Sequence, residues 1–548
     1  MKSKRVVSAL LCTVLLAGMA GSITGCNEGG GGESPIGTNS SGQYAETVHF
    51  TTVRAAEANP NMPEGMDLTN NPYATRIKDK LNVTYEFLWT DSDYNNKLLL
   101  DMTTGNLPDV FMVNDYTMYQ QLYASDLIED LTDVYEEYAS DEMKAIYESY
   151  GDKIFSPVTE NGRLMALPST ANGYQQALLW VRKDWLDALG LDPPKTLDEI
   201  AYVARQFVEQ DPGGNGPGET IGININREGA FAGYRNSYGL EPVAAALGAY
   251  PRQWMQDENG EVYYGSIQPE FKQTLSLVLE WIDAGIIDKD CFEQGWETIW
   301  GNVTSGKAGM WFFPWSWPYE TQFIINNPRA EVICYPAPLD SNGKATYFTG
   351  APFEGVLCVR KGYEHPEVIF KVFEVYSDMT NGIDAEGYEM LAPVREAGTS
   401  WYYIAPLAAY DCRWNDVIPR GAEDMKAWIE DGTEPEIFND STKESYQKVK
   451  DWLDKGDDPA NWSEYMARYV ASAVTDGDEW NPVDPCFFFQ TKSMTDIWDY
   501  LQTMENDMIR TILNGEESID SFDQFVLDWK AAGGDQITAE VAAEVNGG

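Results

Sequence analysis

Alternating and helically spaced apolar positions divide the chain beyond about residue 44 into short strands and amphipathic helices. Residues 47–53 alternate apolar and polar side chains, which is the pattern of a half-buried strand. Residues 95–104 instead place apolar side chains at helical spacing, and Gly105 and Pro108 follow where such a helix would end. The same patterns predict strands over 47–53, 82–88, 109–113, 177–181, 307–311, 331–335 and 355–359, and helices over 73–81, 95–104, 185–189, 197–209, 271–281 and 366–376.

The order of these elements predicts an α/β fold. Strands separated by helices of roughly 10–15 residues are typical of βαβ units and a parallel sheet. The helix over 197–209 has a recognisable start, because Thr196 and Glu199 have the spacing of a capping box. Beyond about residue 380 the periodicity is mainly helical, and the chain carries no internal repeat.

The N-terminal region has the pattern of an export signal followed by a tether. Basic residues precede an uncharged apolar stretch over 6–20, which is shorter than the roughly 20 residues that span a membrane. The string Ile-Thr-Gly-Cys that ends at Cys26 resembles a bacterial lipobox, in which the cysteine becomes the lipidated first residue. We therefore expect a signal peptide over 1–25, lipidation of Cys26 and a flexible Gly/Ser tether over 26–43. An ordinary secretory signal with an incidental cysteine is the alternative.

Charge and cysteine content argue against several classes of function. The 548 residues include 87 acidic and 38 basic side chains, a net charge of −49, which opposes binding to nucleic acid or to anionic lipid. The two histidines, His49 and His365, lie beside no cysteine, so zinc ligation and a histidine-based catalytic apparatus both lack support. The cysteines after Cys26 are predicted to be small, buried apolar residues: Cys291, Cys334, Cys358, Cys412 and Cys486.

Several strings along the chain resemble one family. Residues 104–110 read Thr-Gly-Asn-Leu-Pro-Asp-Val and resemble the Ser-Gly-x-Leu-Pro-Asp-Val turn of extracellular solute-binding proteins of ABC sugar importers. Residues 161–168 are similar to a hairpin of that family, 182–199 to its crossover segment and 306–310 to its Gly-Lys-Ala-Ala-Met strand. Residues 522–541 resemble the C-terminal signature of the long lipoprotein subgroup. The strings occur in the family's order over nearly the whole mature chain.

The resemblance implies a two-lobed periplasmic-binding-protein-like fold (type II) with a mostly helical C-terminal third. In this fold two α/β lobes are joined by crossing hinge segments, and the ligand binds in the cleft between them. The implied division assigns 44–170 plus 341–395 to lobe 1 and 171–340 plus 396–548 to lobe 2. It also implies a monomeric receptor on the extracellular face of the cell membrane, which works with ABC permease subunits and is not an enzyme.

The densest aromatic stretch, over 300–319, supplies candidates for sugar binding. A carbohydrate needs aromatic faces for its rings and polar side chains for its hydroxyls. Trp315 and Trp317 lie in a Pro-bounded segment just past a strand, where ligands of α/β sheets bind. Both are therefore predicted to face the cleft, whereas Trp300 stays open between cleft and core.

Further binding candidates come from turns that face the cleft in the family. Asp115 and Tyr116 follow the strand that ends at residue 113, and Asn172 and Tyr174 lie where the chain would first cross between the lobes. The alternative for Asp115 is an ordinary helix cap. Three more candidates lie before a later strand or near the expected third crossing, where hinge packing is the alternative: Tyr347, Glu354 and Trp401.

The loop over 211–220 partly matches a calcium-binding loop. Asp211, Asn215 and Glu219 would supply side-chain oxygens at the first, fifth and ninth positions. Pro217 would supply its carbonyl oxygen at the seventh. The third and twelfth positions hold glycine, so two ligands are missing. A structural Ca²⁺ held by these four residues is one hypothesis, and a Gly-rich turn without metal is the other.

These observations combine into one functional prediction and two rivals. The prediction is an extracellular substrate-binding lipoprotein that captures a sugar or oligosaccharide by hinge closure and delivers it to a permease. The many tryptophans favour a ligand of several rings. An exported glycoside hydrolase, which needs a pair of carboxylates, is the first rival. The second is a surface adhesion protein that binds glycan without import.

Overall fold

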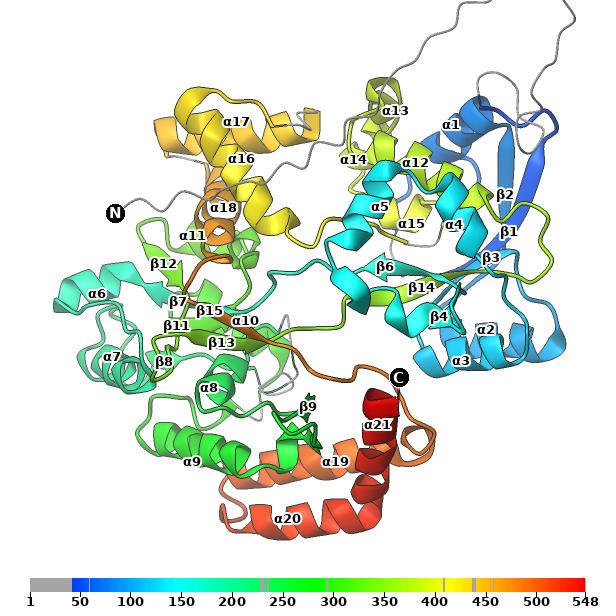
Figure 1. Ribbon diagram of the computed structural model, residues 1–548. Coiled ribbons are helices and arrows are strands. Elements are labelled where there is room, and N and C mark those ends of the chain that lie inside the picture. Colours follow the sequence, from blue (N-terminus) through cyan, green and yellow to red (C-terminus); the bar gives the residue numbers. More distant parts are fainter. Residues whose placement is uncertain are drawn as a thin grey trace, which may run out of the picture.

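The computed structural model describes residues 42–547 apart from 59, 227–230, 232, 234–235, 292–293, 408–409, 436–439 and 457. The predicted signal peptide, Cys26 and the tether as far as residue 41 lie outside the described residues. Separate hydrophobic cores divide the described chain into two lobes, which lie next to one another in Figure 1. The predicted two-lobed α/β architecture is confirmed.

Lobe 1 begins with a parallel βαβ unit. Strand β1 (Val48–Ala55) pairs in parallel with β2 (Val83–Asp91), and helix α1 (Pro72–Leu81) connects them. The other elements of lobe 1 are α2 (Tyr94–Thr104), β3 (Val110–Val113), α3 (Tyr116–Ala124), α4 (Thr132–Tyr138), α5 (Asp141–Glu148), β4 (Thr159–Glu160), β5 (Arg163–Leu164), β6 (Leu167–Thr170), β14 (Phe353–Val359), α12 (Val368–Thr380), α13 (Ala385–Met390), α14 (Ala392–Glu396) and α15 (Trp401–Ile404). Strands β3, β14 and β6 form an antiparallel sheet in that order, with β1 against β3.

Lobe 2 is built on a mixed four-stranded sheet. Its elements are β7 (Leu178–Arg182), α6 (Lys183–Leu189), α7 (Leu197–Gln210), β8 (Ile221–Ile223), α8 (Glu241–Ala246), β9 (Trp254–Gln256), β10 (Val262–Tyr264), α9 (Pro269–Asp283), α10 (Trp296–Thr304), β11 (Ala308–Phe313), α11 (Gln322–Asn326), β12 (Val332–Tyr335), α16 (Val417–Asp431), α17 (Asp440–Lys455) and α18 (Pro459–Glu464). The strand order is β12–β7–β11–β8. The predicted capping box is confirmed, because Thr196 and Glu199 bond each other's backbone at the start of α7.

The predicted strands and helices are confirmed within a few residues, but the predicted parallel sheet is only partly right. Parallel pairing joins β1 to β2 and β8 to β11. Strand β7 runs antiparallel to both of its neighbours, and so does β14. Each of these two strands begins after the chain has crossed from the other lobe. Neither is therefore joined to its neighbours by the helical crossover that parallel pairing requires.

The chain crosses between the lobes along three segments, which we call the first crossing (171–177), the second crossing (349–352) and the third crossing (411–416). Two of the predicted lobe boundaries move as a result. Strand β13 (Ala345–Phe348) pairs with β15 (Trp480–Val483) and packs on α8, so it belongs to lobe 2. Ile404, Leu407 and Tyr410 belong to the core of lobe 1, which therefore extends beyond residue 395.

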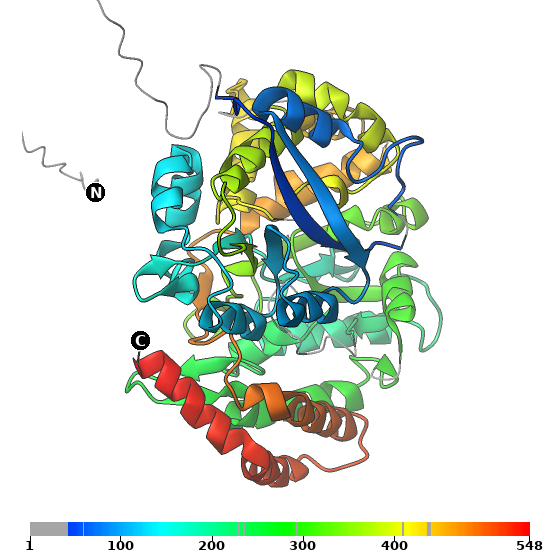
Figure 2. The same ribbon diagram turned by 90° about the vertical axis from the view of Figure 1, so that its right-hand side faces the viewer.

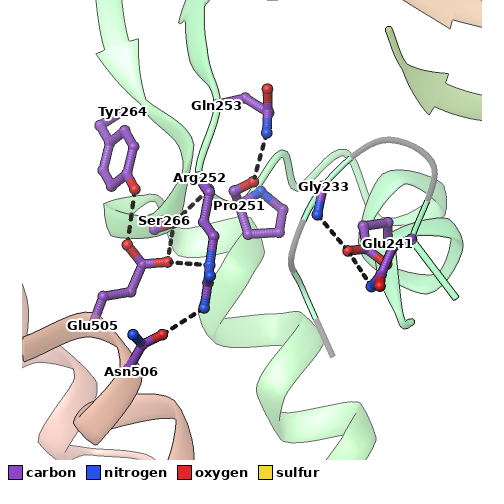
Figure 3. A network of polar contacts seen from close by, with 10 residues as sticks. Gly233, Glu241, Pro251, Arg252, Gln253, Tyr264, Ser266, Glu505 and Asn506 are labelled. Atoms are coloured by element: carbon purple, nitrogen blue, oxygen red, sulfur yellow. Dashed lines mark hydrogen bonds and ion pairs between the residues drawn. The ribbon is translucent and has the colours of Figure 1, made fainter. Parts of the chain in front are cut away.

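Three helices complete the chain: α19 (Met494–Leu513), α20 (Ser521–Trp529) and α21 (Asp535–Gly547). They pack against lobe 2, at the end of the molecule away from β1 and β2 (Figure 1, Figure 2). Glu505 on α19 anchors them, since its buried carboxylate accepts hydrogen bonds of 2.8 Å from both Tyr264 and Ser266. The carboxylate also lies 3.3 Å from Nε of Arg252 (Figure 3). Four polar groups thus join α19 to the β9–β10 hairpin.

The described cysteines behave largely as predicted. All five carry free thiols; four are buried and Cys486 is half-buried. Within the described ranges, we find no helix with both the length and the apolar character needed to cross a membrane.

Candidate ligand-binding site

The first and third crossings run beside each other and form the floor of the region between the lobes. The amide of Gly173 donates a 3.0 Å hydrogen bond to the carbonyl of Asn415, and the amide of Arg413 donates one of 2.8 Å to Oγ1 of Thr170. A Cβ atom at Gly173 would lie 2.9 Å from the Asn415 carbonyl oxygen, so the two backbones can approach this closely only with glycine. The next residue, Tyr174, has a φ of 61°, a strained value for a bulky side chain.

A small hollow of about 30 Å³ lies at the edge of the lobe 2 sheet, where the first crossing enters β7. Buried Gln176 lines it and donates a 2.6 Å hydrogen bond from Nε2 to the carbonyl of Thr475. Its Oε1 atom has no partner among the described residues. Tyr347 and Trp480 line the same hollow with their rings 5.5 Å apart. The hollow therefore combines aromatic walls with an unused amide oxygen.

Glu241, at the start of α8, is a second buried polar side chain of this hollow. Its carboxyl group accepts hydrogen bonds from the amide of Gly233 at 2.7 Å and from Nδ2 of Asn236 at 2.8 Å (Figure 3). Burial raises its pKa from 4.5 to about 8, against the lowering effect of these hydrogen bonds. Near neutral pH the group is largely protonated, so it can donate a hydrogen bond to a ligand oxygen.

Three tryptophans lie near the crossings, each with a guanidinium group over its ring. Arg468 lies 5.6 Å from the ring centre of Trp315, Arg413 5.6 Å from that of Trp401 and Arg420 4.4 Å from that of Trp414. Together with Tyr174 and three carboxylates they form what we call the crossing rim: Tyr174, Trp315, Trp401, Trp414, Arg413, Arg420, Arg468, Asp411, Asp416 and Glu464. Flat aromatic faces beside charged groups can take a sugar ring and its hydroxyls.

Each guanidinium of the crossing rim has a carboxylate partner close to it in the chain. Arg413 lies 2.7 Å from Asp411, and Arg420 lies 2.8 Å from Asp416. Arg468 lies 3.4 Å from Glu464. The three arginine side chains are 38–48% exposed, so the pairs stand at the surface.

Trp315 and Trp317 divide between the rim and the core. Trp317 is fully buried, so its predicted position in the cleft is wrong. The chain turns into a short 3₁₀ helix, η5 (Trp317–Tyr319), which points Trp317 at Trp311, 4.6 Å away between ring centres. We call the group in which it packs the inner cluster: Trp180, Trp311, Trp317, Phe323 and Trp462. Trp315 is 8% exposed, and its Nε1 donates a 3.2 Å hydrogen bond to Gln175 on the first crossing.

The first two candidates from lobe 1 have local roles in the structure. Asp115 caps α3, because its Oδ1 accepts a 2.9 Å hydrogen bond from the amide of Met118, as the capping alternative expected. The ring of Tyr116 lies 4.2 Å from that of Phe489, and its hydroxyl donates to the carbonyl of Pro157 at 3.0 Å. Asp115 also lines a polar hollow of about 290 Å³ that Gln490 and the start of α19 close from the other side, so its role toward a ligand stays a prediction.

The remaining candidates lie in different surroundings. Asn172 is half-buried in the first crossing, and Glu354 is exposed at the start of β14. Trp300 is half-buried and donates a 2.6 Å hydrogen bond from Nε1 to Glu320, away from the three crossing-rim tryptophans. The structure therefore places Asn172, Tyr174, Trp401 and Trp315 at or beside the crossings and Tyr347 in the hollow beside Gln176. Trp300 and Glu354 lie elsewhere.

A segment after β15 bridges the lobes and was not expected from the sequence. Phe489 lies against two lobe 1 residues, Tyr116 at 4.2 Å and Phe353 at 6.0 Å between ring centres. Asp484 forms an ion pair with Lys153 of lobe 1. It also accepts a 2.8 Å hydrogen bond from Thr349, the first residue of the second crossing. Gln176, Glu241 and the rim arginines were also missed, since they come from distant segments and carry no local motif.

The loop over 211–220 fits calcium poorly. Oδ1 of Asp211 accepts a 2.6 Å hydrogen bond from Thr220, and Oδ2 accepts one of 2.9 Å from the amide of Gly216. Glu219 lies 2.6 Å from Lys307, which neutralises it. These contacts lower the pKa of Asp211, with the Thr220 hydroxyl as the largest cause. The loop is thus held by its own hydrogen bonds.

The two glycines of this loop also have a structural reason. A Cβ atom at Gly213 would lie 2.5 Å from the ring of Trp185, and one at Gly222 would lie 2.7 Å from the Ile286 carbonyl oxygen. No side-chain ligand can therefore occupy the third or twelfth position of the loop. Among the described residues there is no group of three or more His, Cys, Asp or Glu side chains that could hold a metal ion.

Comparisons with known proteins support the fold and the family. A sequence model described as bacterial extracellular solute-binding protein matches residues 73–376, more than half of the chain. The chain is 25% identical over 302 residues to lipoprotein LipO of Bacillus subtilis, an alignment that covers 54% of this chain and 57% of LipO. It is 24% identical over 283 residues to the fructooligosaccharide ABC transporter substrate-binding protein FusA of Streptococcus pneumoniae, covering 49% and 50% of the two chains.

The match therefore spans about half the length of each curated relative. Among solved structures, an extracellular solute-binding protein from Bifidobacterium longum subsp. infantis superposes with a TM-score of 0.63 at 15% identity. That superposition covers 93% of this chain and 99% of the other. At such low identity it shows a shared two-lobed fold.

Proposed function

The chain belongs to the bacterial extracellular solute-binding proteins, and from that premise we propose that it binds a carbohydrate for an ABC importer. The ligand is an oligosaccharide that occupies the region between the lobes. Hinge closure around it gives the permease subunits a liganded state to recognise. The protein acts as a monomer and catalyses no reaction on its ligand.

The observation that carries this proposal is the crossing rim. Trp401 and Trp414 are half-buried, and each has an arginine over its ring and a carboxylate beside that arginine. Such side chains match the two needs of a sugar, a flat surface for C–H faces and paired donors and acceptors for hydroxyls. The hollow beside Gln176 and Glu241 adds a buried amide oxygen and a carboxyl group.

The names of the relatives agree with this chemistry. FusA is named as a fructooligosaccharide-binding component of an ABC transporter, and LipO as a lipoprotein. The lipobox-like string before Cys26 supports lipidation at that residue, which would anchor the protein on the extracellular face of the membrane. Stable anchoring by lipid requires more than one acyl chain, and several acyl chains on Cys26 with a flexible tether would suit a receptor that must stay near its permease.

Isothermal titration calorimetry against uncharged oligosaccharides of two to six rings, including fructooligosaccharides, tests the proposal. We expect saturable binding by at least one series, with oligomers bound more tightly than their monomers. Chromatography of each mixture after incubation shows whether the ligand is returned intact. Failure of every series to bind would contradict carbohydrate recognition, and turnover of a bound series would support the hydrolase instead.

Lipidation at Cys26 is tested separately from ligand binding. We expect Cys26→Ser to release the protein into the medium of the producing cells while ligand binding stays unchanged. Fractionation of cells and medium measures the release. A protein that remains with the membrane after this substitution would contradict lipidation at Cys26 and leave the binding proposal intact.

A further inference from the structure

The charges of the crossing rim bear on which oligosaccharides the cleft can accept. Proteins that bind uronic acids commonly direct an arginine at the sugar carboxylate, because the planar guanidinium meets it with two parallel hydrogen bonds. An arginine already paired with a side-chain carboxylate has fewer donors and less net charge to offer. Whether the rim arginines are paired with carboxylates therefore indicates which ligand charge the cleft favours.

All three rim arginines are paired. Nε of Arg413 lies 2.7 Å from Asp411, in the third crossing itself. Arg420 forms hydrogen bonds of 2.8 Å and 2.9 Å with the two oxygens of Asp416. Both bonds start from Nη2 of Arg420, and the carboxylate offsets the positive charge that would otherwise attract a uronate.

Arg468 has a more complex set of partners. Its Nε lies 3.4 Å from Glu464 and donates a 3.1 Å hydrogen bond to the hydroxyl of Tyr319. The Tyr319 hydroxyl in turn donates to Glu464 at 3.3 Å. The three groups form a closed set over the Trp315 ring, so this guanidinium too is committed within the protein.

The surroundings add negative rather than positive charge. After burial, the negative charges of Asp476 and Asp416 raise the pKa of Tyr174 on the first crossing. Asp476 thus brings a fourth carboxylate to a rim with three arginines. The chain as a whole carries −49 charges, and a long-range field of that sign repels an anionic ligand.

Resting on the carbohydrate-binding function proposed above, we propose that the cleft selects uncharged oligosaccharides and rejects those that carry uronic acid carboxylates. When a neutral sugar binds, the paired arginines polarise the tryptophan rings from behind and form hydrogen bonds with the sugar hydroxyls. For a uronate, the rim carboxylates oppose the sugar carboxylate, and the charge of each rim guanidinium is already matched by a carboxylate of the protein.

A matched panel tests this selection. Uncharged gluco-, fructo-, xylo- and galacto-oligosaccharides are compared by calorimetry with galacturonate and mannuronate oligosaccharides of equal ring number, at low and at physiological salt. We expect the tightest binding from an uncharged series. The uronate series should bind at least about tenfold more weakly than that series. Equal or tighter binding of a uronate series would overturn the selection while supporting carbohydrate binding. Binding of neither class would instead contradict the proposed function.

A single substitution tests whether the crossing rim causes the selection against uronates. Asp416→Asn removes the charged partner of Arg420 and leaves an unmatched positive guanidinium over Trp414. We expect the ratio of uronate to neutral affinity to rise about three- to fivefold, the effect of one half-exposed charge contact. Asp507→Asn is the matched control, because Asp507 pairs with Arg510 on α19, remote from the rim, and the net charge changes equally. A ratio that rises equally in both variants, or in neither, would contradict a role for the rim pairs.

Discussion

The inner cluster and the crossing rim are both rich in tryptophan, yet their rings have opposite surroundings. In the inner cluster, Trp317 lies 4.8 Å from Trp180 and 4.6 Å from Trp311 between ring centres, and all three are fully buried. In the rim, Trp401 and Trp414 are half-buried, and each has a guanidinium group over its ring. A high density of aromatic residues in the sequence therefore does not show whether those side chains pack in the core or bind a ligand.

The two groups also differ in how their indole N–H groups are satisfied. Trp180 donates a 3.0 Å hydrogen bond to the carbonyl of Phe313, but Nε1 of Trp311 and of Trp317 have no partner in the described part of the chain. Trp315, by contrast, reaches Gln175 on the first crossing. The inner cluster is held together by ring contact, and a buried unpaired donor opposes part of that stabilisation. The predictions below separate the two groups experimentally.

Trp317→Ala should have the largest effect on stability. Truncation of a fully buried tryptophan leaves a cavity among four other rings, and we expect a loss of about 3–5 kcal/mol in the free energy of unfolding of lobe 2. Urea unfolding followed by circular dichroism measures it. Trp414→Ala is the comparison variant, with an expected loss of about 1 kcal/mol or less because the ring is half-exposed. Equal losses in the two variants would erase the distinction between cluster and rim.

The pH dependence of stability should reveal the buried carboxyl group of the hollow. The pKa of Glu241 rises from 4.5 to about 8 on folding, so the folded state holds its proton more tightly. This contribution is fully present below about pH 4.5 and is lost as the pH rises, with about 4 kcal/mol gone by pH 8.

Glu241→Gln keeps the shape and removes this titration. We expect the variant to lose less stability than the parent chain between pH 5 and pH 8, as measured by thermal melting across that range. Glu354→Gln is a control on an exposed glutamate. Identical pH profiles for the Glu241 variant and the parent would contradict a raised pKa at this position.

Substitution of a rim tryptophan should weaken binding with little change in fold. We expect Trp414→Ala to reduce affinity for the best oligosaccharide about tenfold, because one aromatic face for a sugar ring is lost. Trp428→Ala is matched to it, since Trp428 also has a cation over its ring, Lys450 at 5.8 Å, but lies on α16 outside the rim. If calorimetry found the same loss of affinity in both variants, Trp414 would not be part of the binding site.

Calcium should have the smallest effect. Because the oxygens of Asp211 accept hydrogen bonds within the loop and Glu219 is paired with Lys307, we expect millimolar Ca²⁺ to leave the melting temperature unchanged. Mg²⁺ at equal ionic strength controls for salt effects. A rise in melting temperature with Ca²⁺ alone would show that the loop rearranges to bind the ion.

Local signals in the sequence predicted the elements well. Helix α7 begins at its capping box, and α2 ends at Gly105, because both signals act within one helical turn. Strand direction was harder to predict. The sequence around β7 reads like any buried strand, and its antiparallel pairing follows from the crossing that precedes it.

The site was predicted less well than the fold, for a similar reason. Tyr174 and Trp401 were expected near the crossings, where the structure places them, but the partners that shape their surroundings come from other segments. Glu241 lies 65 residues from Gln176 in the chain, and Arg468 lies 153 residues from the Trp315 ring that it covers. Trp317 was misplaced because a two-residue difference from Trp315 spans a turn of a 3₁₀ helix. Such reversals of direction leave no trace in composition or spacing.

The point where the folded chain begins has a mechanical consequence. Tyr44 packs into lobe 1, where its hydroxyl donates a 2.7 Å hydrogen bond to buried Glu367 and Lys371 lies 4.6 Å over its ring. A lipid anchor at Cys26 would therefore pull on lobe 1, and lobe 2 would hang from it through the three crossings. Under the function proposed above, closure around a ligand would move lobe 2, with its C-terminal helices, relative to a membrane-bound lobe 1.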